Sequence, residues 1–179
     1  HGAVIVYKKS IIATGFNSKD SDISYLKSQN FKLDHLRKIQ SLSNKVDIKK
    51  IIYLSSIHVY SNNLKGIINE HSSASNDISN YAKIHLKAEK YILSKIKNTN
   101  NIILRLSNVF GYSNHSKKGK DYLANNLIEN AYKKKVIKIK SPVNFYRDLI
   151  TFDFFLKSIF FIIKNQKITT NIINISSGK

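Results

Sequence analysis

Two neighbouring serines, Ser55 and Ser56, follow an apolar run and are the first residues of the chain whose types suggest chemistry. Loops at the carboxyl ends of strands form the ligand crevice of α/β sheets, so two hydroxyl groups there could hold a substrate oxygen. A serine pair after a strand is also ordinary turn chemistry, because hydroxyl groups bond readily to nearby backbone. Both interpretations stay open on these residues alone.

Tyr81 and His85 are four residues apart, the spacing that puts two side chains on one face of a helix. A phenol beside an imidazole can transfer a proton, because a nearby cation stabilises the phenolate and lowers the pKa of a tyrosine. The same spacing also suits an interface pair or a packed first helical turn. The pair is therefore a candidate acid/base site with a structural alternative.

Arg147 stands out in a chain whose 30 basic residues are mostly lysine. A guanidinium group can bind a phosphate or carboxylate through two parallel hydrogen bonds, which a lysine cannot do. Arg147 could equally pair with its neighbour Asp148 or with the end of a helix. Its type favours anion binding, and its surroundings in the sequence do not decide the question.

Alternating strands and helices are expected to position these residues. A continuous apolar run, typical of a strand buried on both faces, lies at 51–54, and further strands are expected at 102–106, 136–139 and 171–175. Amphipathic segments with the helical period lie at 80–97, 121–134 and 151–164. Asn80 is the expected N-cap of the first of these helices. The alternation predicts an α/β domain with a mainly parallel sheet.

The first 50 residues have a weaker pattern. Residues 3–6 could form a strand, residues 15–28 have the polar composition of a loop, and residues 31–42 carry apolar side chains on one helical face. No internal repeat or linker divides the chain. We therefore expect one domain over residues 1–179.

The composition excludes several classes of protein. A chain that is 42% hydrophobic can bury a core, and a chain without Cys has no disulfide, thiolate metal site or cysteine nucleophile. No metal site is expected. The longest apolar stretch, 150–163, contains Asp153 and Lys157 and is shorter than the ~20 residues of a bilayer span. A half-buried helix and no membrane partner are therefore expected.

The formal net charge of +19 would by itself point to nucleic acid or to an anionic surface. Most of this charge comes from lysine, and the chain is also rich in Ile and Asn, which is the bias of an AT-rich codon usage. The sequence shows no helix-turn-helix, zinc or ribonucleoprotein signature. A basic nucleic-acid-binding module, with Lys133–Lys135 beside Tyr132, stays an alternative, and no specific nucleic-acid partner is expected.

Five segments occur in the order typical of one family, the extended short-chain dehydrogenase/reductases, which include the NAD-dependent nucleotide-sugar epimerases and dehydratases. They resemble, in turn, the strand with Ser-Ser-x-x-Val-Tyr-Gly, the Tyr-x-x-x-Lys helix, Leu-Arg-x-x-Asn-Val-Tyr-Gly, Arg-Asp-Phe-Ile-x-Val-Asp and Asn-Ile-Gly-x-Gly. In this chain the segments lie at 52–60, 81–89, 104–111, 147–153 and 174–178. Each segment alone is a weak signal, but five in the family's order are specific.

The resemblance implies a Rossmann-like, doubly wound fold, NAD or NADP as cofactor and a nucleotide-linked sugar as substrate. Tyr81 would be the acid/base, and Ser56 would hydrogen-bond the reacting sugar oxygen. Ser55 and His85, together with Tyr81, would contact the cofactor, and His85 would also take part in catalysis. The substrate diphosphate would be bound by two further residues, Asn108 and Arg147. The resemblance also implies that residues from about 110 to 179 form substrate-binding elements of this domain.

The family also suggests a cellular setting. The resemblance implies a cytoplasmic NAD(P)-dependent enzyme of nucleotide-sugar metabolism and polysaccharide biosynthesis. Family members often pair through two helices, and residues 31–42 and 81–97 are the candidates for a homodimer contact. The sequence does not distinguish epimerisation, dehydration and reduction, which share the core residues.

Two departures from the family pattern support a second alternative, a catalytically degenerate member. His85 stands where the family has lysine, and a histidine is cationic only part of the time near neutral pH. The glycine-rich turn that receives a cofactor pyrophosphate is not found. The chain has no Met, and residues 1–3 resemble the end of the family's fourth strand. We therefore expect an N-terminally truncated fold that lacks the first three strands.

Overall fold

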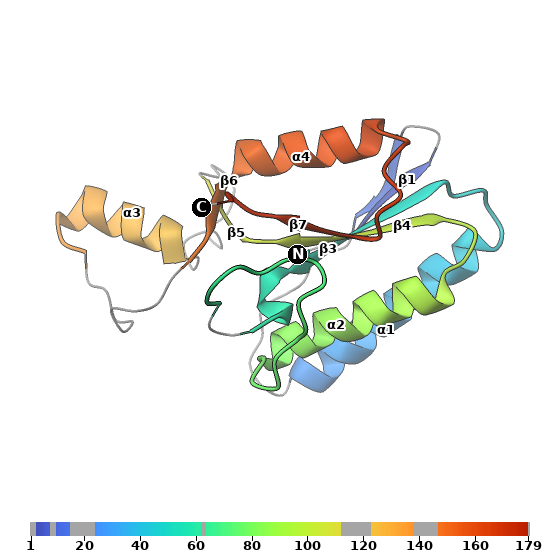
Figure 1. Ribbon diagram of the computed structural model, residues 1–179, viewed down its shortest axis with the longest axis horizontal. Helices are drawn as coiled ribbons and strands as arrows, with labels where there is room; N and C mark the ends of the chain where they lie inside the picture. The colour runs from blue at the N-terminus through green and yellow to red at the C-terminus, as the bar shows by residue number, and fades with distance from the viewer. Residues whose placement is uncertain are drawn as a thin grey trace. The chain divides into compact units, whose positions relative to one another are not determined.

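A five-stranded sheet forms the centre of the larger of two units in the computed structural model of the chain (Figure 1). The structure describes residues 3–7, 10–14, 24–61, 64–111, 123–137 and 147–178. The strands, in their spatial order, are β2 (Ser10–Thr14), β1 (Ala3–Tyr7), β3 (Lys50–Ser56), β4 (Asn100–Leu106) and β7 (Ile172–Ile175).

The strands that carry the predicted motifs are parallel. β3 pairs with β4, and β4 pairs with β7, both in parallel register. Nearly every residue of β3 and β4 is buried, which explains their continuous apolar runs. The prediction of an α/β fold with a mainly parallel, Rossmann-like sheet is confirmed for this part of the chain.

β1 is the exception to the parallel arrangement. It forms an antiparallel hairpin with β2 and also pairs antiparallel with β3. The sequence comparison places the end of a strand at residues 1–3, whereas β1 begins at Ala3. β1 and β2 run antiparallel because two strands joined by so short a connection can pair only in that sense.

Two helices pack on this sheet from one side (Figure 1). α2 (Asn80–Lys95) packs against β3 and β4, and α1 (Ser24–Ser43) packs against α2. Apolar side chains from all four elements form the core, namely Leu36, Ile39, Ile51, Tyr53, Ala88, Ile92 and Ile103 together with Ile48 and Ile96 from the adjoining segments. The N-cap of α2 is Ser79, whose hydroxyl accepts from the Ala82 N–H at 3.2 Å. The prediction of Asn80 as the cap is therefore wrong by one residue.

The chain folds into two units, and each unit is formed by two separate segments of the sequence. Residues 1–106 and 167–175 form the first unit, and residues 107–166 and 176–179 form the second. The second unit contains a parallel pair of short strands, β5 (Asn108–Phe110) and β6 (Leu149–Thr151), and the helices α3 (Leu123–Lys134) and α4 (Phe152–Lys164). The helices predicted at 121–134 and 151–164 are confirmed by α3 and α4.

Helix α4 begins at a capped end and carries the longest apolar stretch of the sequence. The Thr151 hydroxyl accepts from the Phe154 N–H at 3.1 Å. Asp153 and Lys157, which interrupt the stretch, form an exposed ion pair one turn apart at 2.7 Å. Within the described ranges, no helix is long and apolar enough to cross a membrane.

Two predictions about secondary structure need correction. Residues 24–28 were predicted as part of a loop but belong to α1. Tyr25, Leu26 and Lys27 are compatible with a helix, and the polar residues beside them do not prevent the helix from beginning at Ser24. Val136 and Ile137, predicted to begin a strand, are exposed and belong to no strand. They follow Lys135, whose positive φ of 56° ends α3. The rest of that predicted strand, and residues 15–23, lie outside the described residues.

Candidate active site

One face of helix α2 carries Tyr81, His85 and Glu89, which follow one another at intervals of four residues. The prediction that the first two share one helical face is confirmed, and their rings are in contact: the ring centroids lie 4.6 Å apart, with the rings edge to face at 63°. Tyr81 is half-buried, whereas His85 is 0% exposed. The histidine therefore lies behind the tyrosine, inside the protein.

His85 has a partner that the sequence did not indicate. The hydroxyl of Tyr53, on β3, lies 3.0 Å from Nδ1 of His85. Burial raises the pKa of Tyr53, and the charges of Glu89 and Tyr81 raise it further. Tyr53 therefore keeps its proton at any pH at which the protein works.

Ser55 and Ser56 point to opposite faces of the sheet, as neighbours in a strand do. Ser55 is fully buried, and its hydroxyl donates a hydrogen bond to the Glu89 carboxylate. Ser56 is 3% exposed and caps the short 3-10 helix η1 (Ile57–Val59), because its oxygen accepts from the His58 N–H at 3.3 Å. Among the residues that the structure describes, the hydroxyl hydrogen of Ser56 has no acceptor. Ser55 therefore has a fixed internal partner, whereas Ser56 retains a hydrogen to donate.

Glu89 also binds Arg105, on β4, through two hydrogen bonds of 2.7 and 3.2 Å. Burial alone would lower the pKa of Arg105, but the hydrogen bonds and charge of Glu89 outweigh it, and the pKa is raised. The guanidinium carbon lies 4.6 Å from the centre of the Tyr60 ring, and the Tyr60 hydroxyl donates to Asn174 at 2.8 Å. These contacts connect α2 with the ends of β3, β4 and β7.

Asn108 and Arg147, the predicted diphosphate ligands, belong to the second unit, whereas the serines, Tyr81 and His85 belong to the first. The amide of Asn108 donates to the backbone oxygen of Asp148 at 3.0 Å, which fixes the residue that follows Arg147. The Asp148 carboxylate accepts from the Ser177 N–H at 3.1 Å. Arg147 is half-buried, and burial lowers its pKa. Each group is thus assembled within its own unit.

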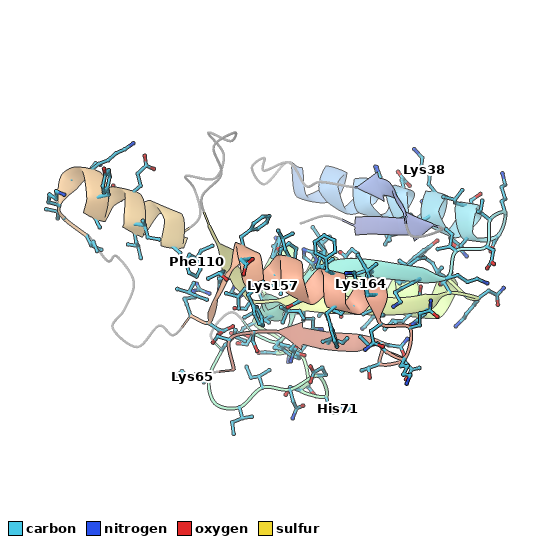
Figure 2. All side chains as sticks on the ribbon, turned by 90° about the horizontal axis from the view of Figure 1, so that it is seen from above. Lys38, Lys65, His71, Phe110, Lys157 and Lys164 are labelled. Carbon is cyan, nitrogen blue, oxygen red and sulfur yellow. The ribbon has the colours of Figure 1, made fainter. Side chains whose placement is uncertain are left out.

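The positive charge of the chain is carried by lysines on separate elements. Figure 2 labels Lys38 on α1, Lys65 in the segment after η1, and Lys157 and Lys164 on α4, and all four are exposed. Exposed lysines that are spread over different elements are typical of solvated charge.

Tyr53 and the buried pair formed by Glu89 and Arg105 are the functional candidates that sequence reasoning missed. Tyr53 was hidden in a run that indicated only a buried strand. Its period-two relation to Ser55 puts both hydroxyl groups on the same face of β3, and that signal could have identified it. Glu89 lies eight residues after Tyr81 and so shares its helical face.

The fold of this chain also occurs in known proteins. A NAD-dependent NDP-hexosamine 5,6-dehydratase involved in tunicamycin biosynthesis has a TM-score of 0.70 and 19% sequence identity, and the match covers 92% of this chain and 54% of that chain. The dTDP-glucose 4,6-dehydratase of Bacillus anthracis in complex with NAD has a TM-score of 0.69 and 17% identity, with 86% of this chain and 49% of that chain covered. The UDP-N-acetylglucosamine 4-epimerase of Bacillus cereus has a TM-score of 0.68 and 20% identity, with 90% of this chain and 55% of that chain covered. The chain spans about half the length of these proteins.

The family itself is shown by sequence. A search of proteins with curated functions gives no match. Residues 17–176, in contrast, match the model of the NAD dependent epimerase/dehydratase family. This match extends over most of the chain and includes the first four segments from which the resemblance was drawn, together with residues 174–176 of the fifth. The chain therefore belongs to the NAD dependent epimerase/dehydratase family.

Proposed function

We propose that this chain carries the catalytic residues of an NAD(P)-dependent epimerase or dehydratase that acts on a nucleotide-linked sugar. The observation that supports this most directly is the state of the Ser56 hydroxyl group. Tyr81, the proposed acid/base, is half-buried, and its ring contacts the ring of His85. Ser56 is nearly buried, and its hydrogen has no acceptor among the described residues. A buried hydroxyl with a hydrogen to donate favours a bound oxygen as its missing partner.

In this proposal Tyr81 exchanges the proton of the reacting sugar hydroxyl, and Ser56 donates its hydrogen to the same oxygen. The hydrogen bond from Ser56 strengthens as the oxygen gains negative charge, which lowers the energy of the transition state. The cofactor, when bound, supplies the acceptor and donor of hydride. The short helix η1 begins directly after Ser56, and α2 carries Tyr81. These two elements are in contact, so the elements that hold Ser56 and Tyr81 pack together.

The residues of this chain fit only one end of the cofactor. Tyr81 is half-buried, and we propose that its hydroxyl group contacts the nicotinamide ribose. No segment of the 179 residues has the glycine spacing of a pyrophosphate-binding turn. Ser55 and His85 expose no surface, so we propose that they support Ser56 and Tyr81 from behind. Asn108 and Arg147 remain the proposed ligands of the substrate diphosphate, with Asn108 also fixing the segment that carries the arginine.

The test is Tyr81→Phe in the full protein, assayed with NAD(P) and a panel of nucleotide sugars. We expect turnover to be lost while cofactor affinity stays within about twofold, because the phenyl ring keeps the packing and only the proton is removed. Tyr132→Phe, which changes an exposed tyrosine on α3, should leave turnover unchanged. Unchanged turnover in Tyr81→Phe would overturn the proposal.

A catalytically degenerate family member is the second candidate. Its support is the histidine that replaces lysine at position 85 and is buried completely. A full protein that binds NAD(P) but converts no nucleotide sugar would favour it. The cytoplasmic location, the part in polysaccharide biosynthesis and the homodimer stay predictions from the family resemblance.

A further inference from the structure

We infer that Tyr53 is a positioning residue that holds His85 as the neutral imidazole with its proton on Nε2. His85 then acts on Tyr81 as a fixed, uncharged neighbour and not as a replacement for a lysine cation. The inference deepens the proposed function, on which it rests for the role of Tyr81. It uses only contacts within the first unit.

The direction of the hydrogen bond between Tyr53 and His85 follows from what each group can offer. Tyr53 is 6% exposed, and in the described part of the chain its hydroxyl has one hydrogen-bond partner, Nδ1 of His85. If Nδ1 donated, the phenol hydrogen would be buried without an acceptor, which native proteins avoid. The raised pKa of Tyr53 also keeps that hydrogen on its oxygen. Tyr53 therefore donates, and Nδ1 accepts.

A neutral His85 follows from the same contact. An imidazolium carries hydrogens on both nitrogens, so its Nδ1–H would face the Tyr53 O–H donor. It would also place a charge on a ring that is 0% exposed, which burial opposes. The carboxylate of Glu89, one turn further along α2, could favour such a cation. That carboxylate is already bound by Arg105 and Ser55, so its charge is compensated.

The consequence for Tyr81 is the loss of a permanent positive neighbour. A lysine at position 85 would stabilise the Tyr81 phenolate through its charge. A neutral imidazole carries no such charge and only packs edge to face against the Tyr81 ring. Tyr53 controls this arrangement without touching any reacting atom. Its effect on turnover should therefore appear in kcat and not in KM.

The first measurement is the tautomer of His85 in the full protein with ¹⁵N-labelled histidine, by long-range proton–nitrogen NMR. The His85 signals are identified by their loss in His85→Asn. We expect the neutral Nε2–H pattern of His85 throughout pH 5 to 8, the range in which an ordinary imidazole changes its charge. In Tyr53→Phe the Nδ1 signal should shift as its hydrogen bond is lost. An Nδ1–H tautomer, an imidazolium, or a signal unchanged in Tyr53→Phe would overturn the inference.

The second measurement is turnover. Tyr53→Phe keeps the ring in the core and should lower kcat about tenfold, the effect of roughly one lost hydrogen bond, at unchanged KM. Tyr91→Phe is the matched control, because it removes a hydroxyl on α2 that binds Gln40 and does not contact His85. A wild-type kcat in Tyr53→Phe would contradict the positioning role.

The two measurements separate this inference from the proposed function. If Tyr81→Phe keeps full turnover, the proposed function fails whatever the tautomer of His85. If Tyr81→Phe is inactive and His85 is charged, the proposed function stands and the inference alone is overturned.

Discussion

The Glu89 carboxylate on α2 and the Arg105 guanidinium on β4 form a buried ion pair with hydrogen bonds of 2.7 and 3.2 Å. Ser55 donates to the same carboxylate, and Tyr60 stacks against the guanidinium. The pair thereby connects the helix that carries Tyr81 with the strands that end beside Ser56. Its loss should affect both stability and the alignment of the site.

Glu89→Gln should be strongly destabilising, because it leaves the Arg105 charge buried without a counter-ion. We expect the free energy of unfolding to fall by about 3 to 5 kcal/mol. Glu129→Gln is the matched control, since Glu129 pairs with Lys133 one turn away on the surface of α3, and it should cost less than about 1 kcal/mol. Urea unfolding of the two variants measures both values. Equal losses would show that the buried pair contributes no more than a surface pair.

The two serines should separate stability from turnover. Ser55→Ala removes the donor to the Glu89 carboxylate, so we expect a loss of about 1 to 3 kcal/mol in the free energy of unfolding, with some turnover retained. Ser56→Ala removes only a weak cap of η1 and should change stability by less, about 1 kcal/mol, while turnover falls at least about a hundredfold. Steady-state kinetics and urea unfolding on both variants check this pattern. The reverse pattern would exchange the roles of the two residues.

Tyr53 should make the protein lose stability in alkali. Burial raises its pKa in the folded state, whereas in the unfolded chain it ionises near its ordinary value of about 10. The folded protein then holds one proton more than the unfolded chain, so stability is full below about pH 10 and falls as the pH rises further. Tyr53→Phe should be less stable near pH 7, having lost the bond to His85, but its decline above pH 10 should be shallower by about 1.4 kcal/mol per pH unit. Parallel slopes in the two proteins would contradict the raised pKa.

Gly111 lies so close to the start of α4 that a side chain does not fit. A Cβ placed there would lie 2.9 Å from Cβ of Phe152, a distance that atoms in proteins do not tolerate. Gly111→Ala should therefore lower the free energy of unfolding by about 1 to 3 kcal/mol. Ile128→Ala, at an exposed position of α3, should change it by less than about 0.5 kcal/mol and is the control. Thermal unfolding of both variants distinguishes the two effects.

The sequence was informative where one physical signal dominated. The mostly apolar segments at 51–54 and 102–106 predicted β3 and β4, because a parallel strand buried on both faces is rich in apolar residues. The four-residue spacing of Tyr81 and His85 predicted their contact, since the helix fixes it locally.

Other features depend on tertiary structure and could not be predicted in the same way. Ser79 and not Asn80 is the N-cap because the backbone of Ser79 is extended, which the sequence pattern does not reveal. The apolar residues at 136 and 137 indicated a strand, but no neighbouring strand pairs with them in the described part of the chain. The contact between Tyr53 and His85 depends on how α2 crosses β3, which lies outside any local pattern.

The return of β7 to the first unit has a consequence for how the chain folds during synthesis. β7 pairs with β4, although residues 107–166 of the second unit lie between them in the sequence. Contacts between such distant segments form slowly, because a long loop must close before any bond is gained. While the ribosome is still making the second unit, the edge of β4 is therefore unpaired and open to association with other chains. Its closure has to wait for β7, so a chaperone would be most useful in the interval between the synthesis of β4 and the synthesis of β7.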